Sequence, residues 1–264
     1  MVQFSAKKSL GQNFLNNPHI PKLMADAGGV VHGDVVVEIG PGTGMLTREL
    51  LARGAKVIAL EADIRAVEIL NELFHDEIMA QRLVISHIDV RRFDIATLGL
   101  RPSAYKVVAN IPYYLSGMLF RIFLEHPIYP SQLVFLVQKE VAERIARDKK
   151  ESLLSLSVKV FGDPVYIKTI KRGNFSPAPK VDSAIIAVNT ISHSRFENIP
   201  LDFFFRILHE GFKSKRKQLL GNLCEIYPRE KLTEIFDSLS LPLNIRGEDV
   251  TLTQWLVLCK VLNT

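Results

Sequence analysis

Glu38-Ile39-Gly40-Pro41-Gly42-Thr43-Gly44 combines a carboxylate with three closely spaced glycines. A run of β-branched apolar residues precedes this stretch and a segment with helical spacing follows it, so it predicts a strand-to-helix turn. Glycines in such a turn let the backbone approach a ligand closely. The next apolar run ends at Glu61, about the twenty-residue interval at which an acidic group meets a ribose hydroxyl in nucleotide-binding α/β folds.

The glycine spacing separates two classes of ligand. Dinucleotide-binding turns have glycines at G-x-G-x-x-G, whereas Met45 occupies the third glycine position here. An acidic residue two positions before the first glycine is the form found in methyltransferases. We therefore expect S-adenosylmethionine, a nucleoside that carries a sulfonium, at Gly40, Gly42 and Glu61. The alternative is a tight turn without a ligand.

Asp89 ends the third apolar run. A carboxylate at the carboxyl end of a parallel strand faces the crevice in which ligands bind, where it can accept a hydrogen bond from an adenine amine. The alternative is that Asp89 caps the following turn. The presence of Glu61 in the same crevice favours the ligand.

The fourth apolar run leads into Asn110-Ile111-Pro112-Tyr113. An exocyclic adenine amine is a poor nucleophile because its lone pair is delocalised into the ring. The Asn110 side-chain oxygen and a backbone carbonyl at Ile111 or Pro112 are candidate acceptors for its two hydrogens, and would direct the lone pair at a methyl group. Tyr113 can stack on an extruded base. An ordinary turn with a core tyrosine is the alternative.

A second aromatic residue begins the proline-rich stretch Phe175-Ser176-Pro177-Ala178-Pro179-Lys180-Val181-Asp182-Ser183. The prolines keep this stretch extended and stiff. We expect Phe175 to cover the other side of the target base, although a lone aromatic residue is more often part of a core.

The elements that must position these residues follow from the apolar pattern. Continuous runs typical of strands buried on both faces span 34–39, 56–60, 83–88, 106–109 and 133–137. Helical spacing between them, as at 46–53 and 64–74, predicts an α/β fold with a doubly wound, Rossmann-like sheet. Two further strands, 166–170 and 184–188, should close the sheet as an antiparallel pair.

Only helical patterns follow the polar stretch 192–200, at 201–212, 216–225, 229–239 and 252–262. We therefore predict a catalytic domain over 1–192 and a small all-α domain over 193–264. Met1 to Lys8 are polar and basic without a following apolar run, so we expect no secretory signal. No membrane span is expected, and the two distant cysteines favour a cytoplasmic protein without a disulfide or a metal.

The formal net charge of +5 is concentrated in one stretch. Residues 139–180 hold ten Lys and Arg against five Asp and Glu, a surplus equal to that of the whole chain. Two basic groups predict a bipartite grip on RNA, with solvated helix faces as the alternative. One group, in the catalytic domain, contains Arg144, Arg147, Lys149 and Lys150, and the other, on a helix of the second domain, contains Lys213, Lys215, Arg216 and Lys217.

Together these motifs resemble the ribosomal RNA adenine dimethyltransferases, and among them the bacterial small-subunit branch linked to kasugamycin sensitivity. The match begins at Lys8-Ser9-Leu10-Gly11-Gln12-Asn13-Phe14-Leu15 and continues through all the motifs above to residues 212–223. It spans nearly the whole chain, and the motifs are highly specific when they occur in this order. Tyr114 stands where many members carry asparagine.

The resemblance implies roles for individual residues. Asn13 and Leu15 contact the cofactor, Gly40 lies under its amino-acid end, Glu61 binds the ribose and Asp89 meets the adenine. Asn110 touches both the cofactor and the target amine. The implied reaction places two methyl groups on each of two adjacent adenosines in the 3′-terminal hairpin of small-subunit (16S) RNA. The implied partner is the small ribosomal subunit, and we expect the protein to be a monomer.

Two other functions remain open. An erythromycin-resistance methyltransferase, which modifies large-subunit RNA, shares the cofactor and Asn-Ile-Pro-Tyr features, but residues 10–13 and 213–223 favour the small-subunit enzyme. A non-catalytic nucleic-acid-binding factor on the same fold is a second rival. Intact Gly40, Glu61, Asp89, Asn110 and Tyr113 argue against it.

Overall fold

The computed structural model describes residues 11–263. The expectations for Met1 to Lys8, and the part of the amino-terminal motif before Gly11, lie outside the described residues. Contacts divide the chain into two compact units. The first comprises residues up to Ala142 together with Asp163–Ile191, and the second comprises Glu143–Gly162 and Ser192 onward.

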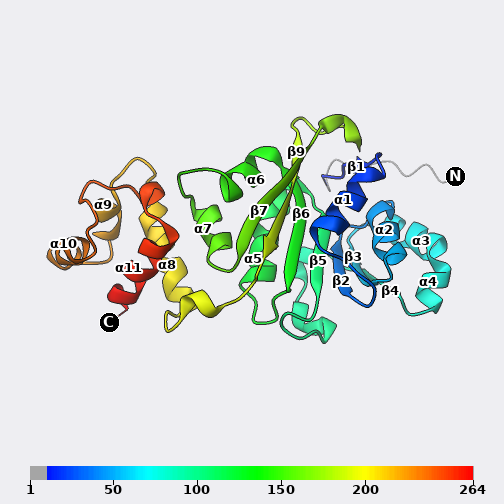
Figure 1. Cartoon of the computed structure of the whole chain (residues 1–264), viewed down its shortest axis with the longest axis horizontal. Coiled ribbons are helices and arrows are strands. Elements are labelled where there is room, and N and C mark those ends of the chain that lie inside the picture. Colours follow the sequence, from blue (N-terminus) through cyan, green and yellow to red (C-terminus); the bar gives the residue numbers. More distant parts are fainter. Residues whose placement is uncertain (1–10, 264) are drawn as a thin grey trace. The chain divides into compact units, whose positions relative to one another are not determined.

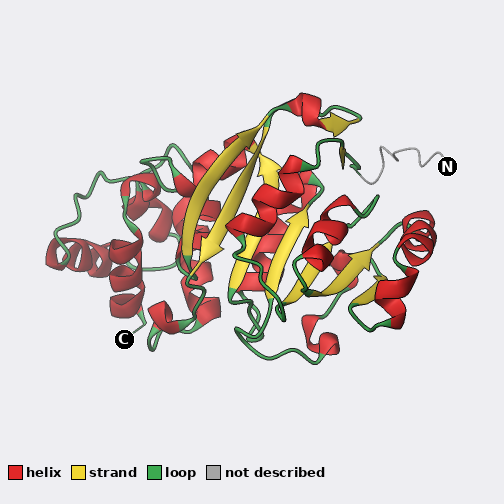
Figure 2. Ribbon diagram, turned by 45° about the vertical axis from the view of Figure 1, so that its right-hand side comes forward, coloured by secondary structure: helices red, strands yellow, loops and turns green. Residues whose placement is uncertain are grey.

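A seven-stranded sheet with the strand order β4-β3-β2-β5-β6-β9-β7 forms the centre of the first unit (Figures 1 and 2). Its strands are β2 (Val35–Ile39), β3 (Lys56–Glu61), β4 (Leu83–His87), β5 (Lys106–Asn110), β6 (Gln132–Gln138), β7 (Asp163–Ile170) and β9 (Ser183–Asn189). The pairs from β4 to β6 are parallel, whereas β9 pairs antiparallel with both β6 and β7. The predicted fold class, including the closing antiparallel pair, is confirmed.

The inner strands β2, β5, β6 and β9 form where the sequence is continuously apolar, because the sheet is covered on both faces there. Val107, Val108 and Ala109 of β5 are fully buried. The helices of this unit are α1 (His19–Ala27), α2 (Met45–Ala52), α3 (Ile64–Leu73), α4 (His75–Met79), α5 (Ser116–Leu124) and the start of α6 (Lys139–Ala146). Figure 1 shows α1 beside α2, which in turn packs against β3.

The strand order reverses between β2 and β5, since β3 and β4 continue the sheet on one side and β6 continues it on the other. At such a switch point the connections leave the sheet in opposite directions and open a crevice at the carboxyl ends of the strands. Gly40 follows β2 and Asn110 ends β5, so the fold places two predicted site residues at this crevice.

A two-residue pairing of β1 (Phe14–Leu15) with β8 (Phe175–Ser176) was not predicted. The pairing joins the amino-terminal motif to the proline-rich stretch. Asn16 N–H donates to the carbonyl of Asn174, and the Asn17 side-chain amide donates to that of Asn174, which extends the contact.

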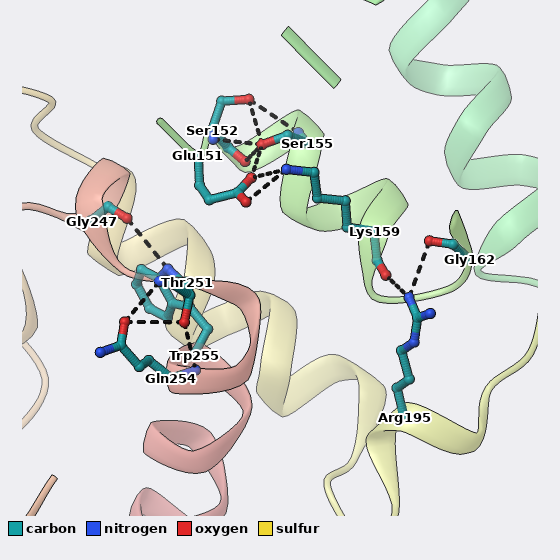
Figure 3. Close-up of polar contacts among 10 residues, drawn as sticks. All are labelled: Glu151, Ser152, Ser155, Lys159, Gly162, Arg195, Gly247, Thr251, Gln254 and Trp255. Carbon is teal, nitrogen blue, oxygen red and sulfur yellow. Dashed lines mark hydrogen bonds and ion pairs between the residues drawn. The ribbon is translucent and has the colours of Figure 1, made fainter. Parts of the chain in front are cut away.

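The second unit contains the rest of α6, then α7 (Leu153–Lys159), α8 (Leu201–Phe212), α9 (Leu219–Leu223), α10 (Arg229–Ser238) and α11 (Leu252–Leu262). Figure 3 shows how polar contacts tie it together: the Arg195 guanidinium donates to the carbonyls of Lys159 and Gly162. Capping boxes start α7 at Ser152 and α11 at Thr251.

Two details differ from the sequence predictions. Residues 143–162 pack with the helical unit, although they precede the predicted boundary at 192. The predicted helix over 216–225 is shorter, because α9 begins only at Leu219 and the basic run before it forms a turn. Buried Leu219 and Leu220 fix the start of the helix. The Asn222 side chain donates to the carbonyl of Gly211, near the end of α8, and to that of Ser214 in the loop that follows.

No helix among residues 11–263 has the length and apolar character needed to cross a membrane.

Candidate functional site

A cavity of about 780 Å³, counted with its open mouth, lies at the carboxyl ends of β2, β3, β4 and β5. The structure brings seven predicted site residues to its wall: Asn13, Gly40, Gly42, Glu61, Asp89, Asn110 and Tyr113. The motifs read separately along the chain therefore form one site.

The glycine turn lines the cavity. Gly40 and Gly42 have positive φ angles of 64° and 56°, which favour glycine. A Cβ added at Gly40 would meet no heavy atom within 4 Å, so the backbone there is open to a ligand. A Cβ added at Gly42 would lie 2.9 Å from the ring of Phe14. The first position favours close approach of a ligand, and the second favours close packing of the amino-terminal segment.

Glu61 is 5 % exposed and both carboxylate oxygens are hydrogen-bonded. Gly42 N–H donates to Oε2 at 3.1 Å and Asp63 N–H donates to Oε1 at 2.9 Å. Burial raises the pKa of Glu61, and backbone N–H donors, that of Asp63 foremost, oppose the rise. Glu61 thus holds the glycine turn against the end of β3, and each oxygen keeps a lone pair for a further donor.

Glu38 is the second buried carboxyl group of this turn. It is 1 % exposed and accepts a hydrogen bond from the Thr47 hydroxyl at 2.7 Å, which ties the end of β2 to α2. Burial raises its pKa to about 8. Glu38 therefore keeps its proton at neutral pH and adds little negative charge beside Glu61.

Asp89 caps the turn that follows it, as one alternative predicted, and it also lines the cavity, where a contact with an adenine amine stays a prediction. Its carboxylate accepts hydrogen bonds from the backbone N–H of Arg91 at 3.0 Å and from Arg91 Nε at 2.9 Å. The hydrogen bonds from the Arg91 side chain lower the pKa of Asp89. Arg91 also lines the cavity and was not singled out from the sequence, where only its position two residues after an acidic cap could have indicated it.

Asn110 ends β5, and its side chain is oriented by the amino-terminal segment. Its Nδ2 donates to the carbonyl of Asn13 at 3.2 Å. This leaves Oδ1 as the acceptor of the amide. The carbonyl of Pro112 already accepts from Leu115 N–H at 2.9 Å, which favours the Ile111 carbonyl as the second acceptor at this end of the strand.

Tyr113 is half-buried and lines the cavity, so it is not a core residue. Its hydroxyl lies 2.6 Å from the Ser183 hydroxyl, and its carbonyl accepts from the Ser116 hydroxyl at 2.7 Å. Tyr114 is 58 % exposed and lies against Gly11, where an added Cβ would be 3.0 Å from its ring. No local pattern indicated the Ser183 and Gly11 contacts, because both join segments far apart in the chain.

Leu15 and Phe175 do not line the cavity. They are 7 % and 3 % exposed, lie opposite each other in the β1–β8 pairing and belong to the hydrophobic core. The side chain of Leu15 is therefore not exposed for the predicted contact with the cofactor. That of Phe175 is not exposed for the predicted cover over a base. Both residues instead anchor the segments that carry Asn13 and Ser183.

The two basic groups lie in the second unit and share one cavity. Its wall includes Arg144 and Lys150 from the first group and Lys215 and Lys217 from the second. The first group therefore belongs to the second unit, whereas the predicted boundary at residue 192 had placed it in the domain that contains the sheet. The exposed run Lys215–Lys217 lies in the loop between α8 and α9, not on a helix face.

Some of these cations already have acidic partners. Lys150 pairs with Glu248 at 2.5 Å, and Lys213 pairs with Glu225 and Glu210. Lys217 lies 3.8 Å from Glu225. Lys213 is therefore already engaged in ion pairs. Among the basic residues of the loop between α8 and α9, Lys215 and Arg216 are the strongest candidates for contacts with an RNA phosphate.

Comparison with known proteins relates the whole chain to one family. A model of the ribosomal RNA adenine dimethylases matches residues 3–264. The chain is 33% identical over 257 residues to a protein of Dehalococcoides mccartyi named ribosomal RNA small subunit methyltransferase A, covering 96% of this chain and 87% of that one.

Two solved structures are also similar. A dimethyladenosine transferase from Plasmodium falciparum superposes with a TM-score of 0.80 at 26% identity, covering 95% of this chain and 97% of that one. The 23S rRNA methyltransferase ErmE has a TM-score of 0.76 at 24% identity over 96% and 100% of the two chains, a likeness of fold. The chain belongs to the ribosomal RNA adenine dimethylase family.

Proposed function

We propose that this protein transfers methyl groups from S-adenosylmethionine to the exocyclic amines of two adjacent adenosines in the 3′-terminal hairpin of small-subunit ribosomal RNA. Family membership supports the reaction class, and the relative from Dehalococcoides mccartyi is named for the small subunit. The observation that carries the proposal is the fixed amide of Asn110, whose nitrogen is committed to Asn13 while its oxygen is left to accept.

The cavity offers space and hydrogen-bond acceptors that suit the cofactor. The turn at Gly40 offers an open backbone, and the carboxylates of Glu61 and Asp89 are acceptors for ribose hydroxyls and an adenine amine. Bound there, S-adenosylmethionine would supply the activated methyl group. The protonated carboxyl of Glu38 keeps further negative charge out of the turn.

The chain's own residues make the target amine nucleophilic. Asn110 Oδ1 and the Ile111 carbonyl accept its two hydrogens, which pulls the nitrogen toward a tetrahedral shape. Pro112, whose φ is −58°, restricts Ile111 to extended conformations and so sets the direction of that carbonyl in advance. Because catalysis then depends on positioning, no strong general base is needed.

The target adenine must leave its stack to reach this site. Tyr113, at the wall of the cavity beside Asn110, provides an aromatic face for it. Stacking on an aromatic side chain is worth about 1–3 kcal/mol per base. Tyr113 thus helps to offset the cost of extruding the base.

Replacing Lys215, Arg216 and Lys217 together by alanine should weaken binding to small subunits and leave cofactor affinity unchanged. The three side chains are exposed and lie in a different unit from the cofactor cavity. Each lost phosphate contact should flatten the log–log salt dependence by about 0.7–0.9. Binding is measured at several salt concentrations, with Lys22, Arg101 and Arg229, three exposed cations outside the basic cavity, replaced as the control. Wild-type affinity and slope in the triple variant would remove this loop from the RNA interface.

The proposal as a whole is tested by methyl transfer to isolated ribosomal subunits that lack the modification. Transfer to the small subunit supports it, and transfer to large-subunit RNA would assign the erythromycin-resistance type of activity instead. Specific RNA binding without transfer would indicate a non-catalytic factor.

A further inference from the structure

Ser183 connects the proposed base-stacking ring to the buried sheet of the first unit. It is the first residue of β9 and is fully buried. Its backbone pairs with Gln138 of β6 on one side and with Ile170 of β7 on the other. A side chain on this residue therefore has little freedom to move.

The Ser183 hydroxyl lies 2.6 Å from the hydroxyl of Tyr113. At the opposite end of the same residue, the carbonyl of Tyr113 accepts from the Ser116 hydroxyl at 2.7 Å. Tyr113 is thus held at its backbone and at the tip of its ring. A ring anchored only at its backbone can still turn about its side-chain torsions, whereas the contact at the tip fixes the direction of the ring.

We infer that Ser183 is a positioning residue for methyl transfer, which sets the direction of the Tyr113 ring on which the target adenine stacks. The inference rests on the proposed function. Ser183 itself does not line the cavity, so it acts only through Tyr113. Burial raises the pKa of Tyr113, so its phenol stays protonated at neutral pH, and either hydroxyl can donate the hydrogen bond between them.

The contacts of the Phe175–Ser183 stretch hold Ser183 in place for this role. Phe175 is fixed in the core opposite Leu15, and Ser183 begins β9, which pairs with both β6 and β7. Between them, Asp182 accepts from Lys171 Nζ at 2.9 Å and from the N–H of Arg172 at 3.0 Å. Both ends of the stretch are therefore anchored, which holds the serine at a defined distance from the cavity.

The test is a double-mutant cycle of Ser183→Ala and Tyr113→Phe, read as the single-turnover rate of methyl transfer to small subunits at saturating cofactor. Each single change removes one hydroxyl and keeps the aromatic ring. We expect each to lower the rate roughly three- to tenfold, the range of one neutral hydrogen bond, and the double variant to lose no more than either single one. The cofactor dissociation constant should stay unchanged in Ser183→Ala.

Tyr166→Phe is the matched control. The Tyr166 hydroxyl lies 2.6 Å from that of Thr169, a pair of the same length in β7 outside the cavity, and its loss should leave the rate at the wild-type value. Independent, additive losses in the cycle would overturn the inference, as would a wild-type rate in either single variant. If Ser183→Ala does not fold, Tyr113→Phe still breaks the bond from the other side, and its rate alone decides.

The failure of this inference is distinguishable from failure of the proposed function. If the wild-type protein transfers no methyl groups to small subunits, the proposed function fails. The inference fails when the wild type is active and the variants show no coupling. Melting temperatures of the four proteins separate a loss of rate from a loss of folding, since a purely structural role would lower stability without changing the rate of the folded enzyme.

Discussion

Asn110→Ala is expected to lower the single-turnover rate of methyl transfer by roughly 100-fold or more, the loss typical of removing one preorganised group that acts in a transition state. The Asn110 oxygen is held at the end of β5 by the donation of its amide nitrogen to Asn13. Its interaction with the target amine strengthens only as the amine nitrogen becomes tetrahedral. The rate of methyl transfer should therefore fall more than the affinity for the cofactor.

Cofactor affinity should fall less than about tenfold in the same variant, because only one neutral hydrogen bond at Asn13 is lost. Rapid-quench measurement of the rate and calorimetry of cofactor binding give the two numbers. Asn71→Ala, at an exposed position on α3, is the control. Equal factors for rate and affinity would make Asn110 a cofactor-binding residue only.

Glu61→Gln is expected to weaken cofactor binding about 10- to 100-fold, since hydrogen bonds to a charged group contribute about 1.5–3 kcal/mol. The variant loses the charge and keeps an acceptor oxygen for only one of the two backbone donors, Gly42 N–H and Asp63 N–H. Calorimetry measures the change, with Glu68→Gln, an exposed carboxylate on α3, as the control. Unchanged affinity would exclude Glu61 from the cofactor site.

The affinity of the wild-type protein should also depend on pH through Glu61. Burial raises its pKa, so the neutral form appears at a higher pH than it does for a surface glutamate. The ionised form is the acceptor that binds ribose hydroxyls, and cofactor affinity should therefore fall as the pH is lowered through this raised pKa. The same titration in Glu61→Gln should lack this dependence, and an identical pH profile in both proteins would contradict the role.

The sequence was most informative where local pattern and global fold agree. The inner strands β2, β5, β6 and β9 are continuously apolar because both their faces are buried. The glycine turn follows the end of β2, and Asn110 ends β5. Their meeting at one cavity follows from the topology of a doubly wound sheet, in which the carboxyl ends of parallel strands share an edge.

The parts that were missed depend on contacts between distant segments. Nothing local in Leu15 or Phe175 indicates that these two residues lie opposite each other in a strand pairing. The amino-terminal strand has only two residues, too few for a periodic signal. The run Lys213–Lys217 has good helix-forming residues, but the contacts of Asn222 with the carbonyls of Gly211 and Ser214 favour a turn. Tertiary contacts override helix propensity there.

Small subunits that lack the modification can be incubated with the protein and methyl-labelled S-adenosylmethionine, and the labelled nucleotides then mapped. We expect two methyl groups on each of two adjacent adenosines in the 3′-terminal hairpin of the small-subunit RNA, and no label in large subunits treated in the same way. Label confined to large-subunit RNA, or no label above that of the Asn110→Ala protein, would contradict this expectation.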